Sequence, residues 1–142
     1  MNKETWDLTP IYKSKKLWYE DYESLLKEIN GLKENNTFIN SGNSLYEKLE
    51  SINNLERRVY KLYMYVKLMK DADGEDNEVS KMFQSAENLF SLYVSKTSYV
   101  NVVLKKLNKT VLDKLKKENP NLEEYNHFFE ALLKDKKHIL SL

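Results

Sequence analysis

The sequence predicts an all-α protein, a helical bundle of five or six helices with one long spine helix and an extended N-terminal arm. Apolar residues recur at steps of three and four over long stretches, and this spacing places them on one face of a helix. Only 3 glycines and 2 prolines interrupt the 142 residues, which favours long helices over strands and turns. Residues 99–104 are β-branched and short enough for a strand, but no second stretch can pair with them. We therefore predict a helix there too.

The spine helix is predicted over residues 43–70. It would be about 40 Å long at a rise of 1.5 Å per residue, longer than a small domain needs. Its apolar stripe consists of Leu45, Leu49, Ile52, Leu55, Val59, Leu62, Val66 and Met69. We expect the other helices to pack against this stripe.

The chain before the spine is predicted to contain an arm, a helix and a loop. Thr9 precedes Pro10 and is therefore pushed out of the helical region, so residues 1–13 form the arm. Ser14 is expected to cap a helix that runs to about Leu32. The apolar face of this helix carries Leu17, Trp18, Tyr22, Leu25, Leu26 and Ile29. Residues 35–43 are rich in turn formers and read as a loop over Phe38 and Ile39.

Three further helices follow the spine. An acidic turn, residues 71–77, leads into a helix antiparallel to the spine, with apolar residues Val79, Met82, Phe83, Ala86, Leu89, Phe90, Tyr93 and Val94. Thr110 is expected to cap a short helix that Asn119 and Pro120 end. The last helix is predicted from about Leu122 toward Lys137, which leaves His138 in a loop. Ser141 is a potential cap for a further helix, so we expect residues 1–142 to be a single domain, with the bundle over 14–142, at the start of a longer protein.

Composition and charge exclude several classes of function. The sequence has 0 cysteines, which excludes disulfides and thiolate metal sites and fits a reducing compartment. It has neither the apolar core of a signal peptide nor an apolar run near 18 residues, so we expect a cytoplasmic protein without a membrane span. A formal charge of +1 provides no global field for nucleic acid. One basic face is interpreted as solvated helix surface, with nucleic-acid binding as the alternative; it consists of Lys105, Lys106, Lys109, Lys114, Lys116 and Lys117.

No catalytic, cofactor-binding or metal-binding residue is assigned. A calcium loop that began at Asp71 would need glycine and glutamate where Asp76 and Met82 stand. A zinc protease helix needs two histidines four residues apart, whereas His127 and His138 are much further apart. The sequence also lacks a GxSxG motif, a glycine-rich phosphate loop and a cysteine nucleophile. The tyrosines of the spine helix, Tyr60, Tyr63 and Tyr65, are interpreted as packing residues, with recognition as the alternative.

Several motifs, taken in order, resemble the oligoendopeptidase F family of M3-type zinc metallopeptidases. The matching segments are Trp6-Asp7-Leu8-Thr9 with Tyr12, Trp18 before Asp21, Leu62-Tyr63-Met64-Tyr65-Val66 before the acidic turn, and Leu122 with Tyr125 before Lys137-His138-Ile139-Leu140-Ser141. Their order and spacing hold across nearly the whole chain. The resemblance implies the N-terminal helical region of a longer enzyme, whose zinc and catalytic residues lie in a catalytic domain absent from this chain.

That resemblance also implies a function and its partners. The chain would form part of the wall of a cleft that admits short peptides, and its partner would be the catalytic domain of the same polypeptide. Apolar residues in segments 6–12 and 140–142 would be exposed in isolation, so we expect self-association. The alternative is a free-standing helical interaction module that binds a partner helix along the apolar stripe of the spine helix.

Overall fold

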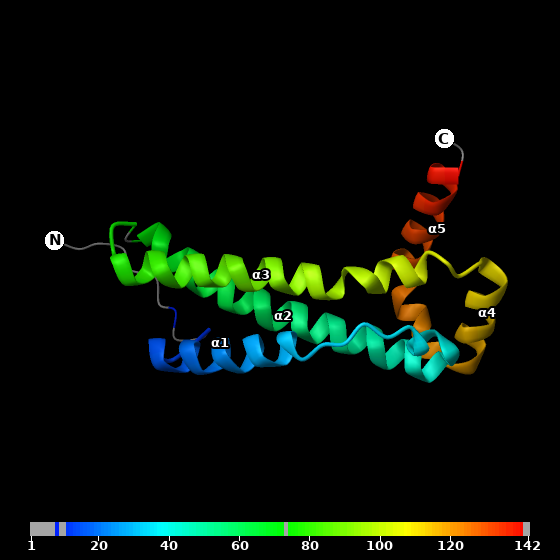
Figure 1. Cartoon of the computed structure of the whole chain (residues 1–142), viewed down its shortest axis with the longest axis horizontal. Helices are drawn as coiled ribbons and strands as arrows, with labels where there is room; N and C mark the ends of the chain where they lie inside the picture. The colour runs from blue at the N-terminus through cyan, green and yellow to red at the C-terminus, as the bar shows by residue number, and fades with distance from the viewer. Residues whose placement is uncertain (1–7, 9–10, 73, 141–142) are drawn as a thin grey trace. The chain divides into compact units, whose positions relative to one another are not determined.

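A computed structural model of the chain describes residue 8, residues 11–72 and residues 74–140, without the side chains of residues 135–140. The described residues form five α-helices and two short 3₁₀ helices, with no strand among them (Figure 1). The elements are α1 (Lys15–Asn30), η1 (Thr37–Asn40), α2 (Gly42–Ala72), α3 (Asn77–Leu104), α4 (Lys109–Glu118), η2 (Pro120–Tyr125) and α5 (Asn126–Leu140). The predicted all-α class and the long spine helix, which is α2, are confirmed. Residues 99–104 are helical as predicted, because they belong to α3.

The chain divides into two compact units. The first unit comprises residues 1–32 and 54–96, and the second comprises residues 33–53 and 97–142. Helices α2 and α3 contribute residues to each unit. No helix in the described part of the chain is long and apolar enough to cross a membrane.

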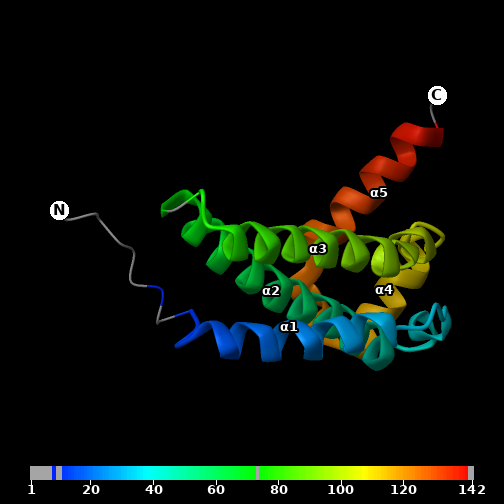
Figure 2. The same cartoon turned by 60° about the vertical axis from the view of Figure 1, so that its left-hand side comes forward.

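In the first unit, α1 lies beside α2 (Figure 2), and Lys15 and Tyr19 of α1 contact Glu78 of α3. The indole N–H of Trp18 donates a 3.0 Å hydrogen bond to the carbonyl oxygen of Leu62, which connects α1 to α2. The buried apolar side chains of this unit are Tyr12, Trp18, Leu25, Ile29, Leu55, Val59, Leu62, Tyr65, Val66, Val79, Met82, Ala86, Leu89 and Tyr93. Leu17, which we predicted on the inward face of α1, is instead 41% exposed, so that face is narrower than predicted.

The start of α1 is held by a side-chain cap and by a buried tyrosine. Ser14 Oγ accepts a 3.3 Å hydrogen bond from the N–H of Leu17, which confirms the predicted cap. Tyr12 is buried, its ring centroid lies 5.2 Å from that of Tyr65 in an edge-to-face arrangement, and its hydroxyl donates a hydrogen bond to Asp21. Residues 1–7, 9 and 10 of the predicted arm lie outside the described part. The burial of Tyr12 and its contacts with Tyr65 and Asp21 hold the described end of the arm against the first unit.

The second unit has a core of its own. Its buried residues are Phe38, Leu45, Leu49, Val100, Val103, Leu104, Leu107, Leu112, Leu115, Leu122 and Phe129. Phe38 is buried as predicted and Ile39 is partly buried, but residues 37–40 of the predicted loop form η1 and α2 already begins at Gly42. Helix α2 begins with a reciprocal cap, in which the N–H of Ser44 donates to Ser41 Oγ at 3.1 Å and the N–H of Ser41 donates to Ser44 Oγ at 3.2 Å. This cap satisfies two backbone donors at the helix start.

Three local predictions in the second unit are wrong. Asn108, not Thr110, caps α4, because its Oδ1 accepts a 2.8 Å hydrogen bond from the N–H of Val111. Asparagine ranks above threonine as a helix N-cap. Residues 122–125 belong to a 3₁₀ helix, and α5 begins only at Asn126. Helix α5 continues to Leu140, so the backbone of His138 is helical and not part of a loop.

Candidate functional site

A surface hollow on the first unit is lined by aromatic residues and one carboxylate. We call it the α2–α3 hollow. Its lining residues are Tyr60 and Tyr63 from α2, and Glu87, Phe90 and Ser91 from α3. Its volume is about 330 Å³. This is near the lower end of the 300–1,000 Å³ typical of ligand pockets.

Helix periodicity explains which side chains line the α2–α3 hollow. Val59 and Leu62 are buried, so the residues beside them, Tyr60 and Tyr63, lie on the flank of α2. Tyr60 is 54% exposed, and Tyr63 is half-buried. Across the gap, Phe90 is 37% exposed, although its spacing predicted an inward position. The hollow therefore exposes aromatic surface that a helix–helix contact would ordinarily cover.

The tyrosine and phenylalanine rings of this region form a continuous row. The ring centroid of Tyr63 lies 5.4 Å from that of Phe83 and 6.4 Å from that of Phe90, which in turn lies 6.4 Å from that of Tyr93. At the Phe83 end, the ammonium of Lys70 lies 4.4 Å from the ring centroid. This distance is within the range of a cation–π contact. One end of the row thus already holds a cation.

The α2–α3 hollow is suited to binding rather than to bond cleavage. Glu87 is its charged lining residue, and no described histidine lines it to activate Ser91 as a nucleophile. Among the described residues, the carboxylate of Glu87 has no hydrogen-bond or ion-pair partner. Aromatic faces attract apolar and cationic groups, and an exposed carboxylate beside them attracts cations.

The second unit has two further hollows, and residues of the segment before α2 contribute to the lining of both. One, of about 340 Å³, is lined by Asn35, Thr37, Phe38, Ser44, Glu47, Lys48 and Ser51. The other, of about 430 Å³, is lined by Glu34, Asn35, Asn36, Tyr99, Val102 and Val103. The ammonium of Lys48 lies 5.8 Å from the centroid of Phe38 and 5.3 Å from that of Tyr99. The aromatic faces here are thus already occupied by a lysine of the same unit.

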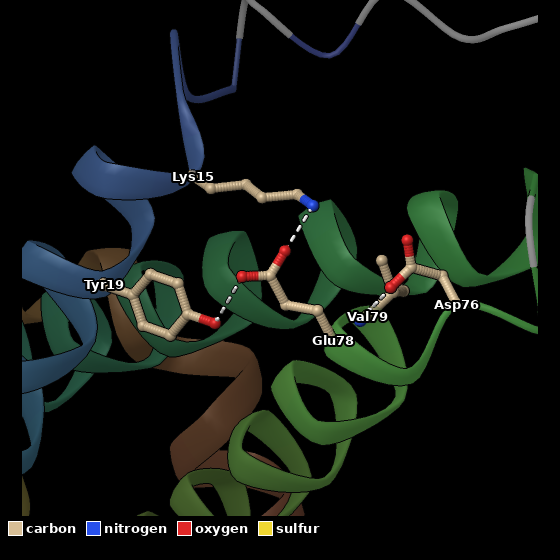
Figure 3. A network of polar contacts seen from close by, with 5 residues as sticks. All are labelled: Lys15, Tyr19, Asp76, Glu78 and Val79. Carbon is tan, nitrogen blue, oxygen red and sulfur yellow. Dashed lines mark hydrogen bonds and ion pairs between the residues drawn. The ribbon is translucent and has the colours of Figure 1, made fainter.

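Asp76 of the acidic turn forms a helix cap and Glu78, just after the turn, forms an ion pair, as Figure 3 shows. Asp76 Oδ1 accepts a 3.0 Å hydrogen bond from the N–H of Val79, so Asp76 caps α3. Glu78 Oε1 lies 2.6 Å from Lys15 Nζ, and its other oxygen accepts a 3.4 Å hydrogen bond from the Tyr19 hydroxyl. The hydrogen bond to Glu78 raises the pKa of Lys15. The contacts of Glu78 join α1 to α3, and Asp76 caps α3. Both carboxylates therefore have a structural role.

The histidines and the basic face do not converge on a site. The imidazole of His127 is fully exposed, and its Nδ1 lies 4.0 Å from a carboxylate oxygen of Glu130. The side chain of His138 lies outside the described residues. Within the described part of the chain, no three histidine, aspartate or glutamate side chains are grouped so that they could hold a metal ion. On the basic face, Lys116 Nζ lies 5.6 Å from the ring centroid of Phe129, and Lys106, Lys109, Lys114 and Lys117 are exposed.

The apolar stripe of the spine helix is covered by the chain itself. Its buried members are Leu45, Leu49, Leu55, Val59, Leu62 and Val66. A partner helix cannot contact side chains that the chain's own elements already cover, so this stripe is not available as the docking groove of a helical interaction module. Of the three spine tyrosines, Tyr65 is buried and Tyr60 is exposed. The sequence did not separate these two roles.

Comparison with known proteins places the chain beside a group of bacterial peptidases. A family profile described as Oligopeptidase F matches residues 104–142. The plasmid-encoded oligoendopeptidase F of Lactococcus lactis subsp. cremoris is 30% identical over 141 residues, a match that covers 98% of this chain and 24% of the relative. Oligopeptidase PepF of Bacillus subtilis is 26% identical over 140 residues, covering 98% of this chain and 21% of the relative. The chain thus spans about a quarter of the length of the curated relatives it matches.

The fold has a counterpart among solved structures. The crystal structure of a putative peptidase from Chlamydophila abortus superposes with a TM-score of 0.77 at 26% sequence identity. The superposition covers 93% of this chain and 22% of that protein. The individual relatives and the solved structure therefore align nearly the whole chain with a small part of a larger protein, whereas the family profile matches residues 104–142.

Proposed function

We propose, from the premise that this chain corresponds to the N-terminal region of the oligopeptidase F family, that it is a non-catalytic helical domain of a zinc oligoendopeptidase. The observation that carries the proposal is the match over 98% of the chain to an oligoendopeptidase F of which it spans 24%. Residues 1–142 act in this proposal as a single domain of a longer cytoplasmic peptidase that hydrolyses short peptides. Neither nucleic acid nor a membrane is a partner.

The chain's own part in this function is to form one portion of the wall of the substrate cleft. The described residues do not fit a zinc site, because they contain no suitable group of metal ligands. The zinc and the residues that act with it therefore belong, in this proposal, to the catalytic domain of the same polypeptide, and no catalytic step is assigned to residues 1–142. The exposed aromatic surface of the α2–α3 hollow supports a binding role.

A complementation assay tests this proposal. The L. lactis relative would be expressed without the portion that this chain matches, and hydrolysis of a short internally quenched peptide would be followed with zinc present. We expect activity when the two pieces are mixed, and little activity from either piece alone. A matched control is Leu122→Asp, which places a charge in the core of the second unit, where Leu122 is 0% exposed. The proposal is contradicted if the native chain does not restore peptidase activity, whether or not the Leu122→Asp variant does.

We also propose that the isolated chain self-associates. The apolar residues first invoked for this behaviour lie in segments 6–12 and 140–142, which fall mostly outside the described residues. Exposed apolar side chains of the first unit that do not line the α2–α3 hollow, Leu17, Tyr19 and Val94, supply such surface within the described part. Light scattering at rising concentration is the test, and a monomer throughout the series would refute self-association.

A further inference from the structure

Cations over aromatic rings recur within this chain. The ammonium of Lys70 lies 4.4 Å from the centroid of Phe83, and that of Lys61 lies 4.6 Å from the centroid of Tyr12. The rings of the α2–α3 hollow differ from these, because no described lysine or arginine lies over Tyr60, Tyr63 or Phe90. The hollow therefore presents aromatic faces that the described part of the chain leaves without a cation.

The hollow also presents a negative charge. Glu87 lines it beside Phe90 and opposite the tyrosines of α2, and its carboxylate has no partner among the described residues. A carboxylate next to the faces of aromatic rings is complementary to a lysine or arginine side chain. The rings pack against the aliphatic stem and attract the cation, while the carboxylate forms the ion pair.

We propose that the α2–α3 hollow binds the basic side chain of a lysine or arginine residue in a peptide. A volume of about 330 Å³ suits one side chain and its adjoining backbone rather than a whole peptide. Tyr60 and Phe90, exposed at 54% and 37%, are reachable without any rearrangement of the core. The inference deepens the proposed function, on which it rests, by naming the substrate class: short peptides with a basic residue.

The occupant is a peptide and not a nucleic acid or a metal ion. A phosphate backbone would be repelled by Glu87, and a metal ion would need a group of ligands that the described residues do not form. Arginine and lysine, in contrast, satisfy the rings and the carboxylate at once. Arginine is expected to bind more tightly than lysine, because its planar guanidinium stacks on tyrosine while it pairs with a carboxylate.

Binding can be measured directly on the 142-residue chain by amide NMR. The probes are the blocked tripeptide Ac-Ala-Arg-Ala-NH₂ and its citrulline analogue, which keeps the shape and removes the charge. We expect the arginine peptide to shift the amide resonances of residues 60–63 and 87–91 and to bind about tenfold more tightly than the citrulline peptide. Equal affinity for the two peptides, no binding, or shifts confined to other residues would each overturn the proposal.

Three variants assign the effect to the hollow. Glu87→Gln should remove most of the preference for arginine, and Tyr60→Leu should weaken binding of the arginine peptide several-fold while keeping apolar surface. Glu23→Gln, on the exposed side of α1, is the matched control and should leave the preference unchanged. A Glu87→Gln chain that keeps the native preference would overturn the assignment. Native-like amide spectra of each variant show that the fold is retained.

A final arm separates this inference from the proposed function. The titration is repeated after complementation with the truncated relative. If that piece abolishes the peptide-induced shifts, the hollow is a contact between parts of the polypeptide, and the inference is wrong although complementation stands. If the chain binds arginine peptides selectively but does not complement, the hollow is confirmed as a basic side-chain site and the peptidase assignment fails.

Discussion

The backbone N–H of Gly42 donates a 2.8 Å hydrogen bond to the carboxylate of Glu118. This contact joins the first residue of α2 to the last residue of α4 within the second unit. A Cβ atom on Gly42 would lie 2.4 Å from the carbonyl oxygen of Leu115 and 2.9 Å from the backbone nitrogen of Asn119. Gly42 does not adopt a positive φ, so glycine is needed here for space and not for conformational freedom. A negative charge at a helix N-terminus also interacts favourably with the helix dipole.

Gly42→Ala should destabilise the chain by about 1–3 kcal/mol, because the new methyl group meets backbone atoms that can yield only if α2 and α4 separate. Urea denaturation followed by circular dichroism measures the change. Gly31→Ala is the matched control, since its nearest contact would be an ordinary 3.4 Å, and it should change the free energy of unfolding far less. Equal effects of the two substitutions would refute the close approach at Gly42.

Asn108→Ala should cost about 1 kcal/mol of stability, because the N–H of Val111 loses the acceptor that caps α4. Thr110→Ala should cost distinctly less, since Thr110 lies inside the helix and is exposed. Thermal and urea unfolding of the two variants decide between the candidate caps. If Thr110→Ala loses more stability than Asn108→Ala, Thr110 is the cap of α4, as the sequence alone predicted.

Trp18→Phe should lower the free energy of unfolding by about 1–3 kcal/mol, through loss of the hydrogen bond to Leu62 and of packing volume. Trp18 is completely buried, so little water can enter to compensate. Leu17→Ala, one position earlier and 41% exposed, is the control and should have a much smaller effect. If the urea midpoint of unfolding is the same for Trp18→Phe as for the native chain, the contact between Trp18 and Leu62 contributes nothing to stability.

Stability should fall as the pH rises above about 10. Burial, followed by the hydrogen bond to Asp21, raises the pKa of Tyr12 above its ordinary 10.0. Burial, followed by the 2.6 Å hydrogen bond to Glu50, likewise raises the pKa of Tyr125. In the unfolded chain these hydroxyls lose their protons near pH 10, whereas in the folded chain they keep them. The unfolded state therefore binds fewer protons, and the free energy of unfolding decreases with pH.

Removing either hydroxyl should flatten this alkaline dependence. Tyr12→Phe and Tyr125→Phe should each reduce the slope of unfolding free energy against pH between about 10 and 11, whatever they do to stability at neutral pH. Tyr60→Phe serves as control, because its ring is 54% exposed. The measurement is urea denaturation at a series of pH values. Slopes that match the native protein in all three variants would contradict the burial of these hydroxyls.

Glu78→Gln should change stability by no more than about 1 kcal/mol, although it breaks the contact to Lys15 that Figure 3 shows. The side chains of Lys15 and Glu78 are 40% and 50% exposed, so solvent and salt screen their attraction. The small difference from the native chain should shrink further in 1 M NaCl. A loss that is large and independent of salt would show that the pair is more buried than the structure has it.

The candidate site was only partly readable from the sequence. Tyr60 and Tyr63 stood out as tyrosines on the spine helix, with recognition as the minor interpretation. Phe90 was predicted to face inward because it lies beside Leu89 and three residues before Tyr93, within the same pattern of apolar residues. The pattern predicted one broad apolar face. Glu87 carried no signal, since one acidic residue on a helix is ordinary. The hollow exists because α2 and α3 place these residues opposite one another, and no local pattern records that pairing.

The sequence by itself determined the class of fold, the long helix α2, the Ser14 cap and the helical state of residues 99–104. Each of these depends on periodicity or on neighbours within a few positions, where local sterics and hydrogen bonding decide the outcome. Only the tertiary structure decided that Gly42 must be glycine and that Tyr60 is exposed while Tyr65 is buried. These properties depend on atoms brought together from distant positions in the chain, where packing outweighs local preference.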